Sequence, residues 1–483
     1  MLRTLRIASV ACGRRNLITH ITDIEGNGEK FFKIVSASRD LSLHGSGRDM
    51  SLRFSPSAHV NSQFVYGGDV GDKGPFSLRL LRLLVDFKKR EPERVHLIVG
   101  NREAKMTRII EELPGGGARD RLLLSPPVFW NKTTPPIAFL GEEIRAINPV
   151  VCPSEHVYSL SDAQCEVLYL RWMLSETMGC GTIKRGGQQD TFELLRQEIA
   201  EVNSVSPQKV EDTKVLDTLR AELQDNGAYY EYLTRGVLMR KLGENLFLHG
   251  AVTSRNLGTV PGRPAPASTL DEWVESLNDW YKDQILRWKR GETKLQSASS
   301  TPGCTDLMSY LVHNPKSVVT TNWYSAERKI VPLADDVVQY LMKSGVRRVI
   351  SGHQPFSDFP LILQHPSNFQ VIVGDTSYSD ESHRWNNQGC AYHTLEILPR
   401  QRKKLSSTDN DLSIEDYDSD TKVCIHSCRN NGKMQHVELV NNSESEIGRI
   451  VNGGVKRLDS NSNWVVSQLH GFDVIDTKCN NDE

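Results

Sequence analysis

The chain has 483 residues, of which 24% are charged and 38% hydrophobic, and its formal net charge is −2. This length exceeds what one hydrophobic core usually serves, so we expect one large domain with insertions and a tail. The charge lacks the basic excess typical of proteins that bind nucleic acid. No apolar run approaches the ~20 residues that span a bilayer. We therefore predict neither a nucleic acid duplex nor a membrane as partner, and the sequence leaves the oligomeric state open.

Nine cysteines at irregular spacing indicate reduced thiols in an intracellular protein rather than a disulfide framework. Cys424 and Cys428 flank His426, but a zinc site needs four ligands and no second pair lies nearby in the sequence, so we interpret them as thiols of a C-terminal unit. Residues 1–15 form a basic overhang, and the first 22 residues contain arginines but no acid. This pattern fits either an organellar transit peptide or a basic extension before the first strand; we expect a cytoplasmic protein.

The first predicted strand leads into an acidic loop. It covers residues 16–22 and runs into Asp23-Ile24-Glu25-Gly26-Asn27, after which residues 29–36 are predicted to be helical. Residues 41–62 are rich in Ser and Arg and are predicted to form a loop.

Residues 64–103 form the clearest unit of the sequence, a strand, a helix and a second strand. The first strand ends in a glycine-rich loop that carries Asp69, Asp72 and Lys73, and the second ends in Asn101 and Arg102. The helix between them has apolar residues at the spacing of one buried face, namely Leu80, Leu83, Leu84 and Phe87. Ligands of open α/β sheets bind beyond the carboxyl ends of the strands, so we expect both loops to face one crevice.

The remaining chain alternates insertions with short strands. Residues 113–160 are predicted to be a long irregular connection, followed by a helical insertion at about 161–242 and a second insertion at about 253–330 that includes a helix at 270–290. Predicted strands at 245–248, 346–350 and 371–373 end in His249, His353 and Asp375, respectively. Residues 401–421 have the composition of a flexible linker, and residues 422–483 are either a small β-rich extension or a tail packed on the main domain, which we place at 16–400.

Carboxylate, amide and imidazole groups thus follow several predicted strands. Carboxylates buried together raise each other's pKa unless a cation neutralises them. This ligand set suits Mn²⁺, Fe or Zn²⁺, and an aspartate can bridge two such ions. Two ions can hold both the attacking and the leaving oxygen of a phosphoryl transfer and make hydroxide available near neutral pH.

Five segments in this order carry a family resemblance. GGDVGDKG, VGNRE, FLHG and SGHQP resemble the GDxxDRG, GNHE, HG and GH motifs of calcineurin-like metallophosphoesterases, and DIEGN stands where that family has GDxHG. The family includes serine/threonine phosphoprotein phosphatases and diadenosine-tetraphosphate hydrolases. The resemblance spans residues 16–400 and implies an α/β fold, a four-layer β-sandwich of mixed sheets flanked by helices.

The resemblance also implies a role for each matched residue. Asp69 would bridge two metal ions, with Asp23 and Glu25 on the first and three further ligands on the second, Asn101, His249 and His353. Asp72 would orient a neighbouring catalytic group, and Lys73 would attract phosphate as a point charge.

Two positions depart from the family motifs. Glu25 replaces a metal-binding histidine, and Arg102 replaces the histidine that protonates the leaving group. Arginine does not lose its proton in proteins, so Arg102 is expected to bind phosphoryl oxygens and stabilise charge instead. Similar DxEGN, GNR-[DE] and DTSYSD segments occur in a eukaryotic branch of the family, in which Asp375 and Tyr378 would line the site.

Simpler structural roles also fit some of these residues. Asp69 and Asp72 suit turns, and the histidines gain their significance from the other motifs. Asn101 could cap a helix over residues 102–112, and Glu25 could be a first-turn acid.

The sequence therefore predicts a hydrolase, a phosphatase dependent on two divalent ions, with Asp72 and Arg102 as catalytic residues and Lys73 and Arg102 as phosphate ligands. A phosphomonoester, either phosphoprotein or nucleotide, is the favoured substrate. Two alternatives stay open: a hydrolase of dinucleoside polyphosphates, whose phosphate leaving group tolerates the loss of an acid histidine, and a catalytically inactive module that binds phosphorylated ligands.

Overall fold

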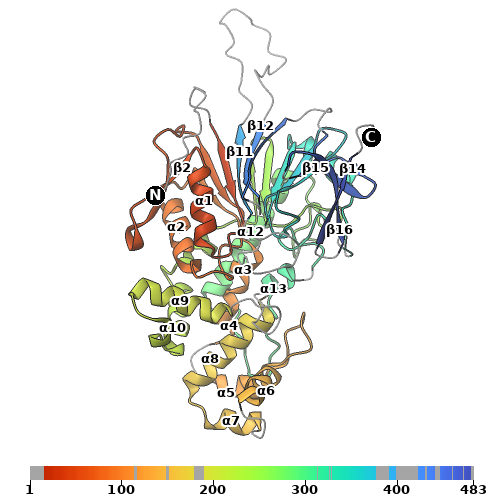
Figure 1. The fold of residues 1–483 in the computed structure, drawn as a ribbon. Helices are drawn as coiled ribbons and strands as arrows, with labels where there is room; N and C mark the ends of the chain where they lie inside the picture. Colours follow the sequence, from red (N-terminus) through yellow and green to blue (C-terminus); the bar gives the residue numbers. More distant parts are fainter. Residues whose placement is uncertain are drawn as a thin grey trace, which may run out of the picture.

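The computed structural model describes residues 16–113, 117–147, 152–178, 190–312, 314–325, 327, 329–376, 391–398, 422–429, 432–440, 446–459, 461–470 and 473–479. The predicted overhang at 1–15, the predicted linker at 401–421 and Tyr378 lie outside these residues. The protein is mixed α/β, with mixed sheets flanked by helices (Figure 1).

The first sheet has six strands in the order β13-β12-β11-β1-β4-β5. Its parallel half consists of β1 (Ile18–Ile21), β4 (Gln63–Tyr66) and β5 (Val95–Leu97). Its antiparallel half consists of β11 (Tyr392–Leu398), β12 (Lys422–Cys428) and β13 (Met434–Val440). The C-terminal strands β12 and β13 therefore continue this sheet.

The second sheet has five strands in the order β6-β7-β8-β10-β9. Three parallel strands form its centre, β7 (Asn245–Leu248), β8 (Arg348–Ser351) and β10 (Gln370–Val373). Antiparallel strands lie at its edges, β6 (Met239–Leu242) and β9 (Leu361–Gln364).

The two sheets share one hydrophobic cluster. Ile18 and Val65 of the first sheet and Phe247, Ile350 and Ile372 of the second belong to it, and each is at most 5% exposed. Strands buried in this way are short apolar runs without polar alternation, as the sequence of β7 and β10 shows.

Helices cover the outer faces of the sheets. On the first sheet, α1 (Gly28–Ala37) and α2 (Ser77–Arg90) bury apolar faces that include Phe31, Ile34 and Leu84. On the second, α12 (Leu270–Lys289) lies along β6, where the Asn278 side chain accepts hydrogen bonds from the Leu238 and Met239 backbone. A further helix, α14 (Asp335–Lys343), precedes β8.

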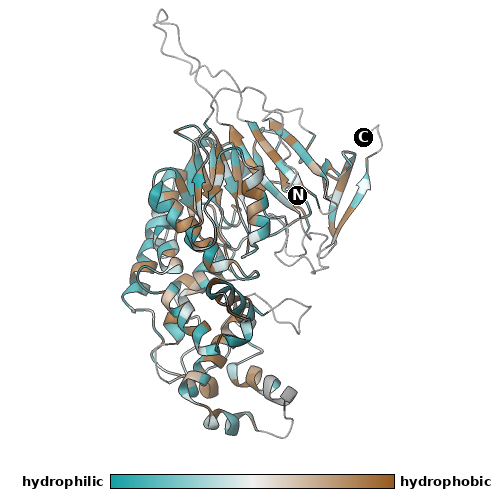
Figure 2. Ribbon diagram, turned by 60° about the vertical axis from the view of Figure 1, so that its left-hand side comes forward, coloured by the Kyte–Doolittle hydropathy of each residue, from teal (hydrophilic) through white to brown (hydrophobic). Residues whose placement is uncertain are grey.

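The other described helices are α3 (Asn101–Lys105), α4 (Thr107–Glu112), α5 (Ala118–Leu124), α6 (Pro136–Ile147), α7 (Pro153–Ser159), α8 (Asp162–Trp172), the π-helical turn Met173–Thr177, α9 (Thr191–Asn203), the short turn Pro207–Lys209, α10 (Asp212–Glu222), α11 (Ala228–Arg235) and α13 (Asp306–Leu311). Of these, α5 to α8 extend beyond one end of the sheets (Figure 1). Hydrophobic and hydrophilic residues mix along these helices (Figure 2), as expected for helices with one buried face. In the described part of the chain, none of the helices is both long and apolar enough to cross a bilayer.

Two expectations about loops are wrong. Residues 41–54 form a hairpin of β2 (Leu41–His44) and β3 (Ser51–Phe54) around a short turn, Gly47–Asp49. Leu41 and Leu52 are buried, whereas Ser42 and Ser51 are half-buried and Arg53 is exposed. The described residues between 113 and 160 include three helices, α5, α6 and α7. Pro136 and Pro153 begin two of these helices, a position where the missing N–H and fixed φ of proline cost nothing.

The last residues form a separate four-stranded antiparallel sheet. It consists of β14 (Ile450–Val451), β15 (Gly454–Leu458), β16 (Trp464–His470) and β17 (Asp473–Lys478). Gln364 at the end of β9 donates a backbone hydrogen bond to Gly448, 2.9 Å away. Arg429 reaches from the end of β12 to the Leu458 carbonyl and to Asp358.

Candidate metal centre

The loops that follow β1 and β4 are bonded to each other along their backbones. Asp23 donates its N–H to the Gly68 carbonyl at 3.0 Å, and Glu25 donates to the Asp69 carbonyl at 3.1 Å. Gly26 continues this pairing with the Val70 carbonyl at 2.7 Å. The two acidic loops, which lie far apart in the sequence, are therefore held side by side at the carboxyl ends of their strands.

Several residues here have left-handed backbone conformations although they are not glycine. The φ angles are 52° at Asp23, 51° at Glu25, 52° at Asp69 and 75° at His353. Such conformations are uncommon outside glycine and cluster at functional sites. Each of these residues bears a side chain that the sequence predicts to bind a metal ion.

Three of the predicted ligands form a group in the described part of the chain. The candidate ligand atoms of Asp69, His249 and His353 lie within 4.8 Å of one another. The Nδ1 of His249 donates to the Gly67 carbonyl at 2.8 Å, which fixes the ring so that Nε2 lies 3.3 Å from Asp69 Oδ1. A histidine oriented in this way by a backbone carbonyl is typical of metal sites.

Three buried atoms in this region lack a hydrogen-bond partner. They are Asn101 Oδ1, His249 Nε2 and His353 Nδ1. Buried side-chain polar atoms are nearly always satisfied in folded proteins. All three are oxygen or nitrogen donors of the kind that bind Mn²⁺, Fe or Zn²⁺. The group of Asp69, His249 and His353 could therefore hold a metal ion.

The charges of this group attract a cation. Burial disfavours a charged imidazole, yet the carboxylates of Asp69 and Asp23 raise the pKa of His249 to about 10. Burial also opposes ionisation of Asp69, but His249 and then Arg102 hold its pKa well below the usual range. Burial lowers the pKa of His353 to about 3, so its ring is neutral and its nitrogen can act as a ligand. A potential that favours a proton on His249 equally favours a metal cation.

Arg102 lies among three carboxylates. Its Nε is 3.2 Å from Asp69 Oδ2, its Nη2 is 3.1 Å from Glu25 Oε1, and its Nη1 bonds to Asp72. Glu25 also pairs with Lys73, with 2.8 Å between Lys73 Nζ and Oε1. The side chains of Glu25 and Lys73 are each 5% exposed and that of Arg102 is 12% exposed, so this network is largely removed from water.

Two further residues shape the site although the sequence analysis did not select them. Glu103 accepts hydrogen bonds from the backbone N–H groups of Asp69 at 3.1 Å, Val70 at 2.6 Å and Gly100 at 2.9 Å. Lys30 is buried on α1 and donates to the Asp23 carbonyl at 3.3 Å. Glu103 could have been found from the sequence, because it lies three residues after Gly100, the N-cap of α3. An acid at this position accepts a hydrogen bond from the backbone N–H of the N-cap residue.

The remaining predicted residues are also near the site. Burial raises the pKa of Asp375 well above its usual value, and the neighbouring charges of Asp23 and Glu25 add to this effect. Asp72 accepts a hydrogen bond from Thr191 through its carboxylate at 3.2 Å. The alternative role of Asn101 as a helix cap is wrong, because α3 begins at Asn101 and Gly100 occupies the cap position.

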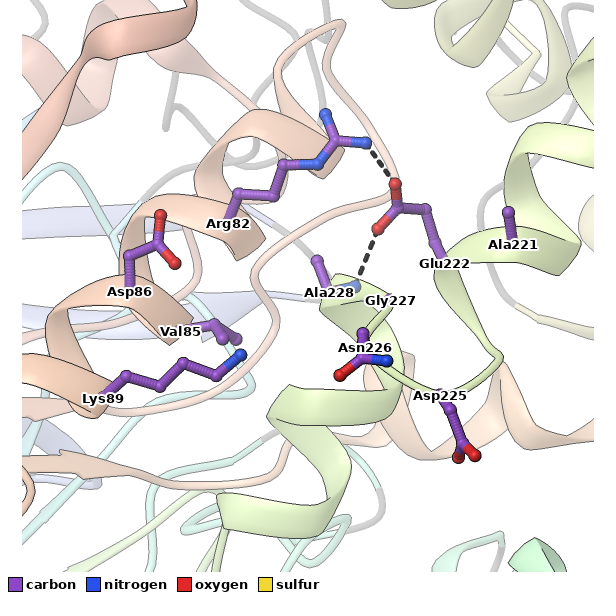
Figure 3. Close-up of a pocket in the computed structure, with 10 residues that line it drawn as sticks. All are labelled: Arg82, Val85, Asp86, Lys89, Ala221, Glu222, Asp225, Asn226, Gly227 and Ala228. Atoms are coloured by element: carbon purple, nitrogen blue, oxygen red, sulfur yellow. Dashed lines mark hydrogen bonds and ion pairs between the residues drawn. The ribbon is translucent and has the colours of Figure 1, made fainter.

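A cavity of about 390 Å³ lies elsewhere, between α2 and the connection from α10 to α11 (Figure 3). Its basic groups are paired: Arg82 bonds to Glu222, and Lys89 lies 3.3 Å from Glu231. Glu222 also accepts the Ala228 N–H at 2.7 Å. The cavity is a mixed-charge gap between helices, away from the strand ends, and we attribute no chemistry to it.

Comparison with known proteins gives a short sequence match and distant structural ones. No protein-family model matches the chain. A stretch of 70 residues is 37% identical to the serine/threonine-protein phosphatase sitA of Aspergillus fumigatus, covering 14% of this chain and 16% of that protein. The chain thus matches a small part of that relative's length.

Among solved structures, the cold-active protein-tyrosine phosphatase of a psychrophilic Shewanella species aligns over 88% of this chain and 80% of its own, with 11% identity and a TM-score of 0.38. A Saccharomyces cerevisiae serine/threonine phosphatase with similarity to human phosphatase PP5 aligns over 86% and 79%, with 10% identity and a TM-score of 0.35. The chain is therefore similar to phosphatases over a short stretch of sequence, and the structural likeness at these TM-scores is too low to define its fold.

Proposed function

We propose that this chain is a metal-dependent phosphoesterase that hydrolyses a phosphate ester, with a phosphomonoester as the favoured substrate. The observation that carries the proposal is the group of Asp69, His249 and His353, joined by Asn101, on four separate strand-end loops. Three donor atoms of this set are buried without a partner. The short similarity to a serine/threonine phosphatase supports a phosphorylated substrate, either a phosphoprotein or a nucleotide.

A divalent ion bound here would polarise a phosphoryl oxygen and provide hydroxide near neutral pH. Asp69, Asn101, His249 and His353 would hold it, and the Gly67 carbonyl keeps His249 in the orientation needed. The resemblance to calcineurin-like enzymes implies a second ion on Asp23 and Glu25, with Asp69 as the bridge.

The proposed roles of the charged residues follow from their chemistry. Asp72 orients Arg102, to which it is bonded. Arg102 cannot donate its proton, so it assists by stabilising negative charge on the phosphoryl oxygens. Lys73 adds a positive point charge next to Arg102 and Glu25. No residue of this set replaces the acid that would protonate an alkoxide leaving group.

That feature favours one second candidate, the hydrolysis of a phosphoric anhydride such as a dinucleoside polyphosphate. A phosphate leaving group is a weak base and departs without a proton from the enzyme. The same metal centre serves both reactions, so the two candidates differ in substrate alone.

Turnover by metal-free and metal-loaded protein tests the proposal. Chelated protein is supplied with Mn²⁺ and assayed with p-nitrophenyl phosphate, phosphopeptides, mononucleotides and dinucleoside polyphosphates. We expect Mn²⁺-dependent release of phosphate that falls by about 100-fold or more in Asp69→Asn, since this removes a charged ligand. Asp279→Asn, an exposed acid on α12, is the matched control and should retain full activity.

Two results would contradict the proposal. Binding of phosphorylated compounds without turnover under any metal would identify an inactive binding module. Equal activity of Asp69→Asn and the wild type would show that the hydrolysis does not depend on this centre.

A further inference from the structure

The two predicted sets of metal ligands have different surroundings. In the set around His249 and His353, the donor atoms Asn101 Oδ1, His249 Nε2 and His353 Nδ1 are buried without a hydrogen-bond partner. Asp69, which both sets share, contacts Arg102 and His249. In the other set, Asp23 and Glu25 have their carboxylates engaged by this chain's own donors. The described residues that form a metal-type group include Asp69 but neither Asp23 nor Glu25.

Glu25 is neutralised by side chains. Lys73 Nζ lies 2.8 Å from Oε1 and 3.0 Å from Oε2, so a single ammonium group contacts both oxygens. Arg102 Nη2 is 3.1 Å from Oε1. With both partners largely buried, a metal ion could bind this carboxylate only after breaking charge-assisted bonds that water does not replace.

Asp23 is held in a comparable way. The backbone N–H of His353 donates to both Asp23 carboxylate oxygens, with N···O distances of 3.1 Å and 3.2 Å. The Thr22 hydroxyl donates to Asp23 Oδ2 at 2.5 Å. Gly352 lies so close to this carboxylate that a Cβ added at that position would be 2.0 Å from Asp23 Oδ2. Lys30 adds a buried positive charge at the Asp23 carbonyl.

Arg102 lies where an ion shared by Glu25 and Asp69 would have to bind. Its Nη2 is 3.1 Å from Glu25 Oε1 and its Nε is 3.2 Å from Asp69 Oδ2. Its Nη1 bonds to Asp72, so three carboxylates fix the plane of the guanidinium group. A metal ion needs carboxylate oxygens at about 2.0–2.2 Å. The Arg102 guanidinium between Glu25 and Asp69 leaves no room for such an ion and repels it by its positive charge.

We infer that this centre binds one divalent ion, on Asp69, Asn101, His249 and His353, and that the Arg102 guanidinium takes the place of the second. The inference rests on the proposed metal-dependent function. It explains together the two departures from the family motifs, since Glu25 supplies the charge that Arg102 and Lys73 neutralise. Arg102 is then a fixed positive charge beside the ion, available to a phosphoryl oxygen in the position where the family has a metal.

Metal content tests the inference without depending on activity. The full chain is dialysed against Mn²⁺, and the bound metal is counted by mass spectrometry and examined by electron paramagnetic resonance. We expect one ion per chain and the signal of an isolated Mn²⁺. Glu25→Gln should keep one ion, whereas Asp69→Asn and His353→Ala should lose it.

A variant of Arg102 tests the role of its guanidinium. Arg102→Met, checked for folding by circular dichroism, should bind a second ion at raised Mn²⁺, because the position between Glu25 and Asp69 is then open. An unchanged count in this variant would refute the assignment of Arg102 to that position.

The outcomes for the wild-type protein separate the two proposals. Two ions per chain with exchange-coupled Mn²⁺, one of them lost in Glu25→Gln, would overturn the single-ion inference and leave the proposed function intact. Absence of bound metal under all conditions would overturn both.

Discussion

Glu103 is not one of the proposed metal-binding residues, but its substitution should strongly destabilise the loops that carry them. Its buried carboxylate accepts three backbone N–H groups, those of Asp69, Val70 and Gly100. Glu103→Ala leaves all three donors buried and unsatisfied, at about 1–3 kcal/mol each, so we expect a loss of about 3–9 kcal/mol in unfolding free energy.

Glu103→Gln provides a graded comparison. Oε2 accepts from Asp69 and Gly100, while Oε1 accepts from Val70 alone. An amide placed with its oxygen at the Oε2 position keeps two bonds and loses one, so its cost should be about 1–3 kcal/mol. Glu29→Ala, an exposed acid on α1, is the control and should change stability by less than about 0.5 kcal/mol.

Urea unfolding followed by fluorescence measures these differences, with equal m-values required for the comparison. Metal binding should weaken in the same order, because Asp69 and Asn101 flank the backbone that Glu103 holds. Equal losses for Gln and Ala, or a loss below about 1 kcal/mol for Ala, would refute this reasoning.

Three other predictions concern the fold. Burial raises the pKa of Glu111 from 4.5 to about 8, so the folded chain should lose stability as pH rises through this interval, by up to about 5 kcal/mol at 1.36 kcal/mol per pKa unit. Glu111→Gln should reduce the fall in unfolding free energy between pH 6 and pH 9 in urea titrations, and a fall equal to that of the wild type would contradict this prediction. Arg108 pairs with Glu112 through two bonds of 2.6 and 2.9 Å in a fully buried position, so Arg108→Met should cost about 3–5 kcal/mol. Adding Glu112→Leu should restore only part of this loss in a double-mutant cycle, because Glu112 also accepts from the Gly303 N–H and the Tyr169 hydroxyl. Trp172→Ala should cost about 3–5 kcal/mol by calorimetry because its ring is fully buried, and a change below about 1 kcal/mol would argue against this packing.

Apolar periodicity made the central elements predictable. The face of Leu80, Leu84 and Phe87 identified α2, and β7 is an apolar run that the sequence places at the same residues. The hairpin of β2 and β3 was not predicted, because its strands have four residues each and expose polar side chains. Helices α6 and α7 were not predicted because their region carries many Gly, Pro and Asn residues, although proline is favoured at the first helical position.

The candidate site was predictable in its residue types and less so in its pairings. The strand-end positions of Asp69, His249 and His353 led to their selection, and the structure brings their ligand atoms together. The contacts of Arg102 with Glu25 and Asp72 depend on how three loops meet, which no local pattern encodes. Their functional roles, and the predicted domain boundaries, stay predictions.

Lys30 could have been found from the sequence. It lies four residues before the buried Ile34 on α1, so a lysine interrupts the apolar stripe of that helix. A charged residue at a position that faces the core calls for a buried partner, and the acids of the preceding loop were the nearest candidates.

The left-handed backbone conformations of Glu25 and His353 lower the unfolding free energy of this protein. A residue with a Cβ gives up about 1–2 kcal/mol in such a conformation, which glycine would recover. Glycine would also remove the side chain, so a substitution that raises thermal stability at these positions would remove a residue of the candidate site. Variants selected for thermal stability should therefore accumulate their changes in the helices and outer strands, and keep Glu25 and His353 unchanged.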